Sequence, residues 1–437
     1  MKLPSAFGVR SLSAGRWADD SRHPLMRTER PMVQNHVLLA ALVVLPATAA
    51  AQTMPTAQRR DSAGVAIVEY ATIKSTLPAF RVAPALLADV GGLRDDPKDE
   101  IEGRTGYEVA VRLTDGRVAV AENYTVRVLD PGGKFVRLLG GRGGGPGEFN
   151  SQIVAMCLTQ GDTLIVRDGR RSVSHYDRAG NHVVSAVADG TGFGSCGPDG
   201  SVLTSTERGD VMGRGRSGVG PAKTPEERAR ELHYAELWRL DRYGKRLDSI
   251  GVFLSYKGPP FGIVSQVFAV AMLGDRVAVG TGTNEIRIHS LAGKLLSIIR
   301  WRDPLIRVTP EIADALAAAR IPTNDPNRAA RIAQTRAMPH PETLPGYSGF
   351  FVDRAKRLWV RDAWPLPGTT TSWNIGWTVF AEDGTWIGRY TPPGGEGVRA
   401  MVTDAGSDFV VVRMRNPDEG VRVIVQSVSL ARPAARD

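Results

Sequence analysis

The chain has 437 residues, of which 42% are hydrophobic and 23% charged, an ordinary balance for a soluble globular protein. Its 48 glycines and 28 prolines are too few for a disordered chain, but they favour a fold with many tight turns. The formal charge is +9, yet the arginines are scattered and often alternate with apolar residues, so we expect no nucleic acid partner.

The N-terminal region resembles a secretory signal. An apolar stretch from Val37 to Pro46 is followed by the small-residue exits Ala47–Ala49 and Ala49–Ala51. The stretch is too short for a stable membrane span, which needs about 20 residues. We therefore predict that residues 1–51 are a targeting segment and that the protein is periplasmic or secreted. The alternative is an N-terminal membrane anchor.

The rest of the chain carries a repeat. Each copy contains a Gly or Asp turn, a short apolar strand, a second alternating strand, a Gly turn and a third strand. The copies begin at Asp115, Gly161, Asp199, Gly274, Lys356 and Ser407. Their spacing of about 40–50 residues suits a four-stranded blade, and one blade cannot bury both of its faces alone. Residues 52–437 are therefore predicted to form an all-β, six-bladed β-propeller with short helical insertions on one face.

The first copy also resembles a known family. Residues 115–149 look like an NHL repeat, which in that family continues into a Gly-rich connection ending in Pro-Gly-Glu-Phe, as Gly140–Phe149 does here. The resemblance covers roughly residues 85–427 and implies a six-bladed propeller. The Gly-rich connection is lost or replaced after the second to fifth copies.

The ring has to close, because the sixth copy ends near Leu430 without an outer strand. Two N-terminal segments have the pattern of a strand, Gly64–Tyr70 and Leu86–Gly91. We expect one of them to complete the last blade, which would leave no exposed sheet edge there.

Three connections are too long for plain turns: residues 205–235, 302–346 and 361–374. Helix signals occur at Thr224-Pro225, Thr309-Pro310 and Asp325-Pro326. If strands are numbered outwards from the axis, the turns between strands two and three and the connections between blades share one face. All three insertions and the Gly-rich connection belong to this class. We call the face that carries these loops the decorated face, and we expect it to bind a partner.

Five residues of these loops are the candidate ligand contacts. Trp364 and Trp373 offer apolar surface, and Arg142, Arg167 and Arg361 offer positive charge. The alternative for the tryptophans is packing within the core or between blades. We predict an exported, monomeric binding module for a protein, peptide or glycan partner, with no cofactor, no metal and no catalytic residues.

The alternative function is a metal-dependent hydrolase or lyase of the lactonase type. Glu122, Asp168 and Asp362 follow second strands and could hold calcium near the axis, or they could cap their own turns. The resemblance also includes propeller lyases with zinc-binding histidines, which have no counterpart here. Gly140–Phe149 lacks the ending of a phosphate-binding loop, so we interpret it as a blade connection with Phe149 packed between blades.

The two cysteines lie at similar places in neighbouring copies. Cys157 and Cys196 each precede the turn into the second strand, near the end of the innermost strand. They could form a disulfide if their Cα atoms lie about 4.4–6.8 Å apart. The alternative is that the blades hold them further apart.

Overall fold

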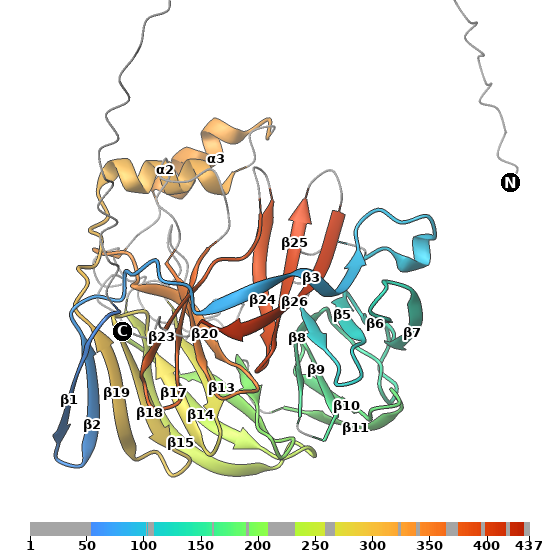
Figure 1. Cartoon of the computed structure of the whole chain (residues 1–437), viewed down its shortest axis with the longest axis horizontal. Helices are drawn as coiled ribbons and strands as arrows, with labels where there is room; N and C mark the ends of the chain where they lie inside the picture. The colour runs from blue at the N-terminus through green and yellow to red at the C-terminus, as the bar shows by residue number, and fades with distance from the viewer. Residues whose placement is uncertain are drawn as a thin grey trace, which may run out of the picture. The chain divides into compact units, whose positions relative to one another are not determined.

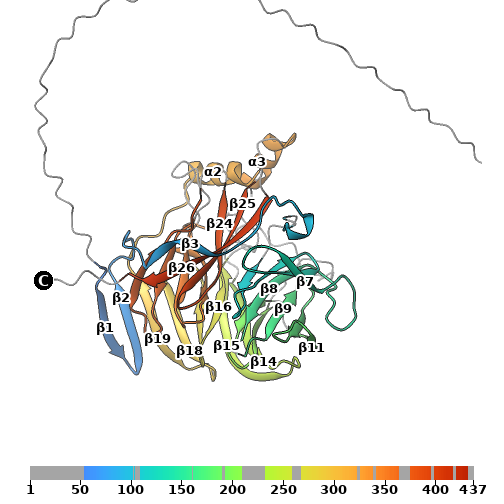
Figure 2. The same cartoon turned by 45° about the vertical axis from the view of Figure 1, so that its right-hand side comes forward.

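The computed structural model describes residues 54–431 apart from 102, 104–108, 160, 189–191, 209–231, 258–266, 322–324, 338–340, 364–374, 395–397 and 417–419. The predicted signal segment lies outside these residues. Six sheets form the blades of a propeller (Figures 1 and 2), so the predicted fold class is confirmed. The innermost strand of the first blade contacts those of both the second and the last blade, which shows that the ring is closed.

Four blades are simple antiparallel sheets in chain order. Blade 1 contains β4 (Ala110–Arg112), β5 (Val118–Glu122), β6 (Thr125–Leu129) and β7 (Phe135–Gly140). Blade 2 contains β8 (Ile153–Leu158), β9 (Leu164–Asp168), β10 (Ser172–Tyr176) and β11 (His182–Val187). Blade 3 contains β12 (Gly192–Cys196), β13 (Val202–Arg208), β14 (Leu232–Leu240) and β15 (Arg246–Lys257). Blade 5 contains β20 (Tyr347–Val352), β21 (Leu358–Asp362), β22 (Trp377–Phe380) and β23 (Trp386–Tyr390).

The core lies between blades, because each sheet is covered on both faces by its neighbours. All five residues of β5 and all five of β9 are buried. Phe149, at the end of the Gly-rich connection, is fully buried among side chains of blades 1 and 2. Gly140 is required beside it, since a Cβ there would lie 2.3 Å from the Phe149 ring. The interpretation of this segment as a packed blade connection is therefore confirmed.

An N-terminal strand completes blade 6. This blade contains β24 (Arg399–Ala405), β25 (Phe409–Asn416), β26 (Gly420–Leu430) and then β3 (Phe80–Gly91), which pairs antiparallel with β26. Val90 lies opposite Val423, and both side chains are fully buried. The prediction that an N-terminal segment completes the last blade is confirmed, and of the two candidates it is Leu86–Gly91 that does so.

The other closure candidate, Gly64–Tyr70, was assigned to the wrong blade. Its strand β2 (Val65–Tyr70) pairs in parallel with β19 of blade 4, and β1 (Ala57–Ser62) pairs with β2. Blade 4 thus has six strands, the others being β16 (Ala269–Leu273), β17 (Arg276–Gly280), β18 (Glu285–Ser290) and β19 (Leu295–Trp301).

Contacts to blade 5 explain why β2 lies there. The Tyr70 hydroxyl donates to the Gly384 carbonyl at 2.9 Å and accepts from the Trp386 amide at 2.6 Å. Further on, the Ala79 amide donates to the Arg389 carbonyl at 2.7 Å. The N-terminal segment therefore runs along the outer edges of blades 4, 5 and 6 in turn.

The 302–346 insertion carries the helices α2 (Pro310–Arg320) and α3 (Arg328–Arg336). The Thr309 side chain caps α2 by accepting from the Ile312 amide, as the sequence predicts. In both cartoons these helices lie beyond the upper ends of β24 and β25 (Figures 1 and 2). A short 3₁₀ helix, η1 (Pro97–Asp99), lies between blades 6 and 1 in the chain. No helix of the described residues is long and apolar enough to cross a membrane.

The 205–235 insertion is shorter than predicted. Residues 205–208 extend β13 and residues 232–235 begin β14, and the two strands pair from Val202 opposite Leu240 to Arg208 opposite Tyr234. The ladder continues because both strands keep an alternating pattern beyond the expected blade. The helix predicted at Thr224-Pro225 lies outside the described residues.

Cys157 and Cys196 form a disulfide, which is one of the two alternatives that the sequence left open. They lie near the ends of β8 and β12, the innermost strands of blades 2 and 3, with their Cα atoms 6.1 Å apart. The bond therefore joins two neighbouring blades close to the axis.

Candidate functional site

Strand parity brings the blade connections and the turns between second and third strands to one face. The Ile153 amide, just after the Gly-rich connection, donates to the Asn123 carbonyl in the β5–β6 turn at 2.6 Å. The Gly346 amide, at the end of the helical insertion, donates to the Gly282 carbonyl in the β17–β18 turn at 2.7 Å. The connections between blades and the turns between second and third strands thus meet on the same face, as the topology requires.

The Gly-rich connection is filled by its own carboxylate. The Gly145 amide donates to Glu148 Oε2 at 2.8 Å. A Cβ on Gly143 would lie 2.0 Å from the same oxygen, so glycine is needed for this approach. Because Glu148 occupies the place where a phosphate would accept from backbone amides, this loop is a closed connection and not an anion cradle.

Arg142 lies on the outer side of this connection and is exposed. Its guanidinium is 5.2 Å from the centre of the Tyr124 ring, which belongs to the β5–β6 turn. A guanidinium group over an aromatic ring gains a cation–π attraction and can still donate hydrogen bonds from its edge. Sequence reasoning selected Arg142 for its charge but missed Tyr124.

Arg167 has a different environment. It ends β9 beside Asp168 and is only 2% exposed. Burial lowers its pKa, while the charge of Asp168 opposes this shift. Arg167 is therefore an interior cation, and the structure does not bring its side chain to the same surface as that of Arg142.

Asp168 caps its own turn. Oδ1 accepts from the amides of Arg170 and Ser172 at 2.9 and 2.8 Å. Oδ2 accepts from the amides of Asn150 and Ser151 at 3.1 and 3.2 Å. Four backbone donors use the lone pairs of this carboxylate, and the last two bind the Gly-rich connection to blade 2. This geometry favours the capping interpretation over a calcium ligand.

Arg361 and Asp362 end β21 on the same face. Asp362 is held by Arg389, whose Nη1 donates at 3.2 Å and whose Nη2 donates to the other carboxylate oxygen. Burial raises the pKa of Asp362, and Arg389 opposes the shift. Burial lowers the pKa of the half-buried Arg361, and the like charge of Arg413 from blade 6 lowers it further. The charges of Arg361 and Arg413, from neighbouring blades, therefore act on each other here.

The third predicted carboxylate also has a basic partner, since Glu122 accepts from Arg127 Nε at 2.8 Å. Among the described residues, no three His, Cys, Asp or Glu side chains are grouped in a way that could hold a metal ion. Glu122, Asp168 and Asp362 thus act in this structure as internal partners of arginines and backbone amides.

The tryptophans can be placed only in part. Trp364 and Trp373 lie outside the described residues, so their assignment to the binding face stays a prediction. Their neighbour Trp377 is 5% exposed in β22 and packs edge-on against Phe351 at 5.3 Å. Trp377 therefore belongs to the core of blade 5.

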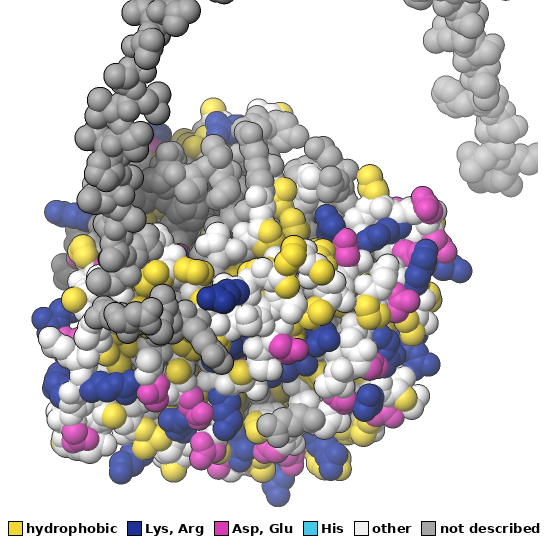
Figure 3. All heavy atoms as spheres, viewed as in Figure 1, with side chains coloured by type: hydrophobic (Ala, Val, Ile, Leu, Met, Phe, Trp, Pro, Cys, Tyr) yellow, Lys and Arg dark blue, Asp and Glu magenta, His cyan; other side chains and the backbone are white. Residues whose placement is uncertain are grey.

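Charges of both signs alternate over the side of the molecule seen in Figure 3, where no stripe of one sign is visible. This distribution agrees with the scattered arginines of the sequence. The arginines near the decorated face are thus distinguished by their burial and neighbours rather than by their number.

Comparisons with known proteins assign no family to the chain. No family model and no curated protein matches the chain. A Bacteroides fragilis protein described as a candidate exported protein has 11% identity and a TM-score of 0.45, covering 84% of this chain and 100% of that chain. The C-terminal WD40 domain of Sif2 has 11% identity and a TM-score of 0.33, covering 73% of this chain and 80% of that chain. BBS1N in complex with ARL6DN has 10% identity and a TM-score of 0.33, covering 74% of this chain and 78% of that chain.

Proposed function

We propose that the protein is an exported binding module whose decorated face holds a protein, peptide or glycan partner. The observation that carries this proposal is the grouping of one helical insertion, the Gly-rich connection and two accessible or half-buried arginines on one face. Loops held by a rigid scaffold are the usual place for recognition. The carboxylates of the same face already accept from arginines or backbone amides, which favours binding over metal-assisted catalysis.

Anionic groups of the partner are the best match to this face. Arg142 is exposed and oriented by Tyr124, so it suits a carboxylate or sulfate at the rim. Arg361 is half-buried at the end of β21, and it adds positive charge to the same face. Arg167 would act through its charge from the interior. We assign apolar contact to Trp364 and Trp373.

Export is part of the same proposal. We infer that residues 1–51 are removed and that the mature protein folds in the periplasm or outside the cell. The disulfide between Cys157 and Cys196 supports an oxidising compartment, because such bonds are rare in reducing ones.

The test uses the mature protein on arrays of acidic peptides and of oligosaccharides with carboxylate or sulfate groups. We expect at least one such class to bind, and Arg142→Ala and Arg361→Ala to weaken that binding at least tenfold. Arg60→Ala is the matched control, since Arg60 is exposed on the outermost strand β1. Equal binding by all three variants would contradict the proposal.

A further inference from the structure

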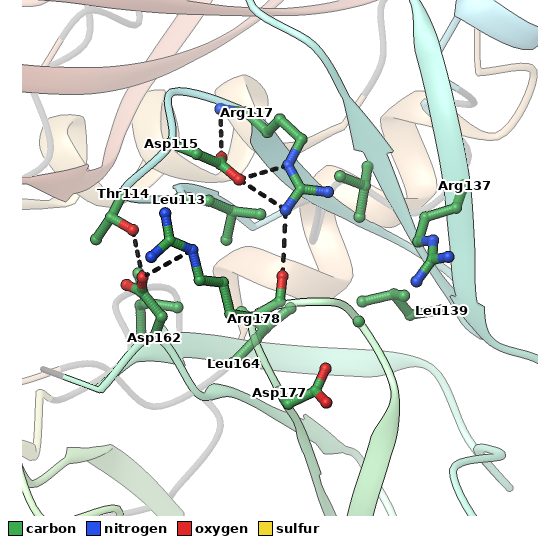
Figure 4. A pocket seen from close by; sticks show the side chains of 13 residues that line it. Leu113, Thr114, Asp115, Arg117, Arg137, Leu139, Asp162, Leu164, Asp177 and Arg178 are labelled. Atoms are coloured by element: carbon green, nitrogen blue, oxygen red, sulfur yellow. Dashed lines mark hydrogen bonds and ion pairs between the residues drawn. The ribbon is translucent and has the colours of Figure 1, made fainter.

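A pocket opens between blades 1 and 2 on the face opposite the decorated face (Figure 4). It lies among the β4–β5, β8–β9 and β10–β11 turns, and its empty volume, including the open mouth, is about 370 Å³. Its walls are aliphatic: Leu113, Val128, Leu139, Leu158 and Leu164. Three aspartates and three arginines complete the lining: Asp115, Asp162, Asp177, Arg117, Arg137 and Arg178. The interior has room for about one water molecule in this state.

Asp162 is the carboxylate of this pocket that can accept a further hydrogen bond. Its side chain is 14% exposed, and Oδ2 accepts from the Thr114 hydroxyl. Oδ1 is buried and has no hydrogen-bond partner among the residues that the structure describes. A buried acceptor without a donor is unfavourable, so the pocket lacks a donor group at this point.

Arg178 covers Asp162 without satisfying it. Its Nε lies 3.6 Å from Asp162 Oδ2, too far for a hydrogen bond, and its side chain is 67% exposed. Exposed ion pairs of this kind are weak, so this guanidinium can rotate into solvent. Figure 4 shows it lying over the Asp162 carboxylate from the edge of the pocket.

The other charged groups of the lining already have hydrogen-bond partners. Arg117 donates to Asp115 Oδ2 at 2.9 Å and to the Arg178 carbonyl at 3.2 Å. Asp177 accepts from the Asn181 amide at 2.8 Å and from its side chain at 3.0 Å. The pocket therefore contains one carboxylate with capacity for a further donor, at the side of an aliphatic slot.

We propose that this pocket binds an alkyl cation, a guanidinium or ammonium group on a short aliphatic chain. The cation pairs with Asp162 and supplies the missing donor to Oδ1, while the chain lies against the leucines. Arg178 occupies this place in the unliganded protein and leaves it when the ligand enters. The site lies on the other face from the partner site proposed above and is independent of it.

The next junction along the ring supplies a matched control. Arg242 lines the crevice between blades 2 and 3 at the same position of its turn as Arg178. Gly200 occupies the turn position in blade 3 that Asp162 occupies in blade 2. The φ angle is 81° at Gly200 and 58° at Asp162, and each backbone amide donates to the carbonyl of the residue three positions earlier. This junction thus has the equivalent arginine but a glycine at the position of Asp162.

The experiment measures binding of n-butylguanidinium to the disulfide-bonded mature protein by isothermal titration calorimetry. Arg178→Ala should bind the probe at least tenfold more tightly than the wild type, and Arg242→Ala should not differ from it. Asp162→Asn in the Arg178→Ala background should abolish the gain, and asparagine tolerates the left-handed backbone, so the fold is kept. Unchanged melting temperatures will verify folding.

Uncharged n-butylurea should bind at least tenfold more weakly than n-butylguanidinium. Acetylarginine amide distinguishes two sources of the same chemistry. If acetylarginine amide binds as tightly as n-butylguanidinium, the proposal is supported and the natural ligand is an arginine side chain of a polypeptide. If n-butylguanidinium binds more tightly, the proposal is supported and the natural ligand is a small molecule. An Arg178→Ala variant no better than Arg242→Ala, or an Asp162→Asn change without effect, would overturn the proposal.

Discussion

Reducing the Cys157–Cys196 disulfide should destabilise the ring at the junction of blades 2 and 3. The cysteines are 39 residues apart in sequence. In the loop-entropy description, a crosslink over this separation stabilises the folded protein by about 4 kcal/mol. With an unfolding entropy of about 2.1 cal/mol/K per residue, this loss corresponds to a fall of about 5 °C in melting temperature for a propeller of this length.

The assay is differential scanning calorimetry of the mature protein with and without a phosphine reductant, with thiol titration to verify that both cysteines are free. Cys157→Ala with Cys196→Ala is the second arm, because it removes the crosslink without reductant. The variant should melt near the reduced wild type and be insensitive to the reductant. A fully reduced protein that melts within about 1 °C of the oxidised one would refute the reasoning.

Three further predictions concern closure, pH and export. Deleting residues 52–92 removes β3 and exposes the edge of β26, so the product should aggregate. Deleting residues 52–62 removes only the exposed strand β1 and should leave a protein that folds cooperatively. Thermal melts followed by circular dichroism distinguish the two products. Burial, with the charges of Arg242 and His182, lowers the pKa of His175 to about 4. In the unfolded chain a histidine binds a proton near pH 6.5, so protonation of His175 favours unfolding at lower pH. The free energy of unfolding should therefore fall by at most about 3 kcal/mol as pH drops from 6.5 to 4, and it should stay flat above 6.5. His175→Gln should remove this dependence, which urea titrations at each pH measure. N-terminal sequencing of the mature protein should begin at residue 50 or 52, and an intact N-terminus on cytosolic protein would contradict export.

Much of the fold follows from local patterns. The alternation in segments such as Val118–Glu122 and Thr125–Leu129 predicts strands, and the Gly turns between them set the blade period. The disulfide was a possibility from sequence, because Cys157 and Cys196 occupy similar positions in neighbouring copies, but the distance between the two strands had to come from the structure. The closing strand was predictable because the sixth copy lacks an outer strand and Leu86–Gly91 has the required pattern.

Long-range geometry explains what the sequence did not predict. The parallel addition of β2 to blade 4 depends on the Tyr70 hydroxyl reaching the β22–β23 turn of blade 5, and no local pattern encodes this contact. Arg167 lies two residues after Ile165, which packs against blade 3, so its burial depends on contacts between blades. The Asp162 pocket depends on three turns meeting at a blade junction, although the Gly161-Asp162 pair does indicate an unusual backbone.

The most direct test of the central claim compares partner binding by variants of the decorated face and by a variant of the outermost strand β1. The mature wild-type protein is titrated with the best ligand from the acidic peptide and anionic oligosaccharide arrays, alongside variants carrying Arg142→Ala with Arg361→Ala, or Arg60→Ala alone. Binding through the decorated face predicts at least a tenfold loss in the double variant, no change in the control, and unchanged melting temperatures. Equal affinity of the double variant and the wild type, or loss of binding only in the control, would contradict the claim.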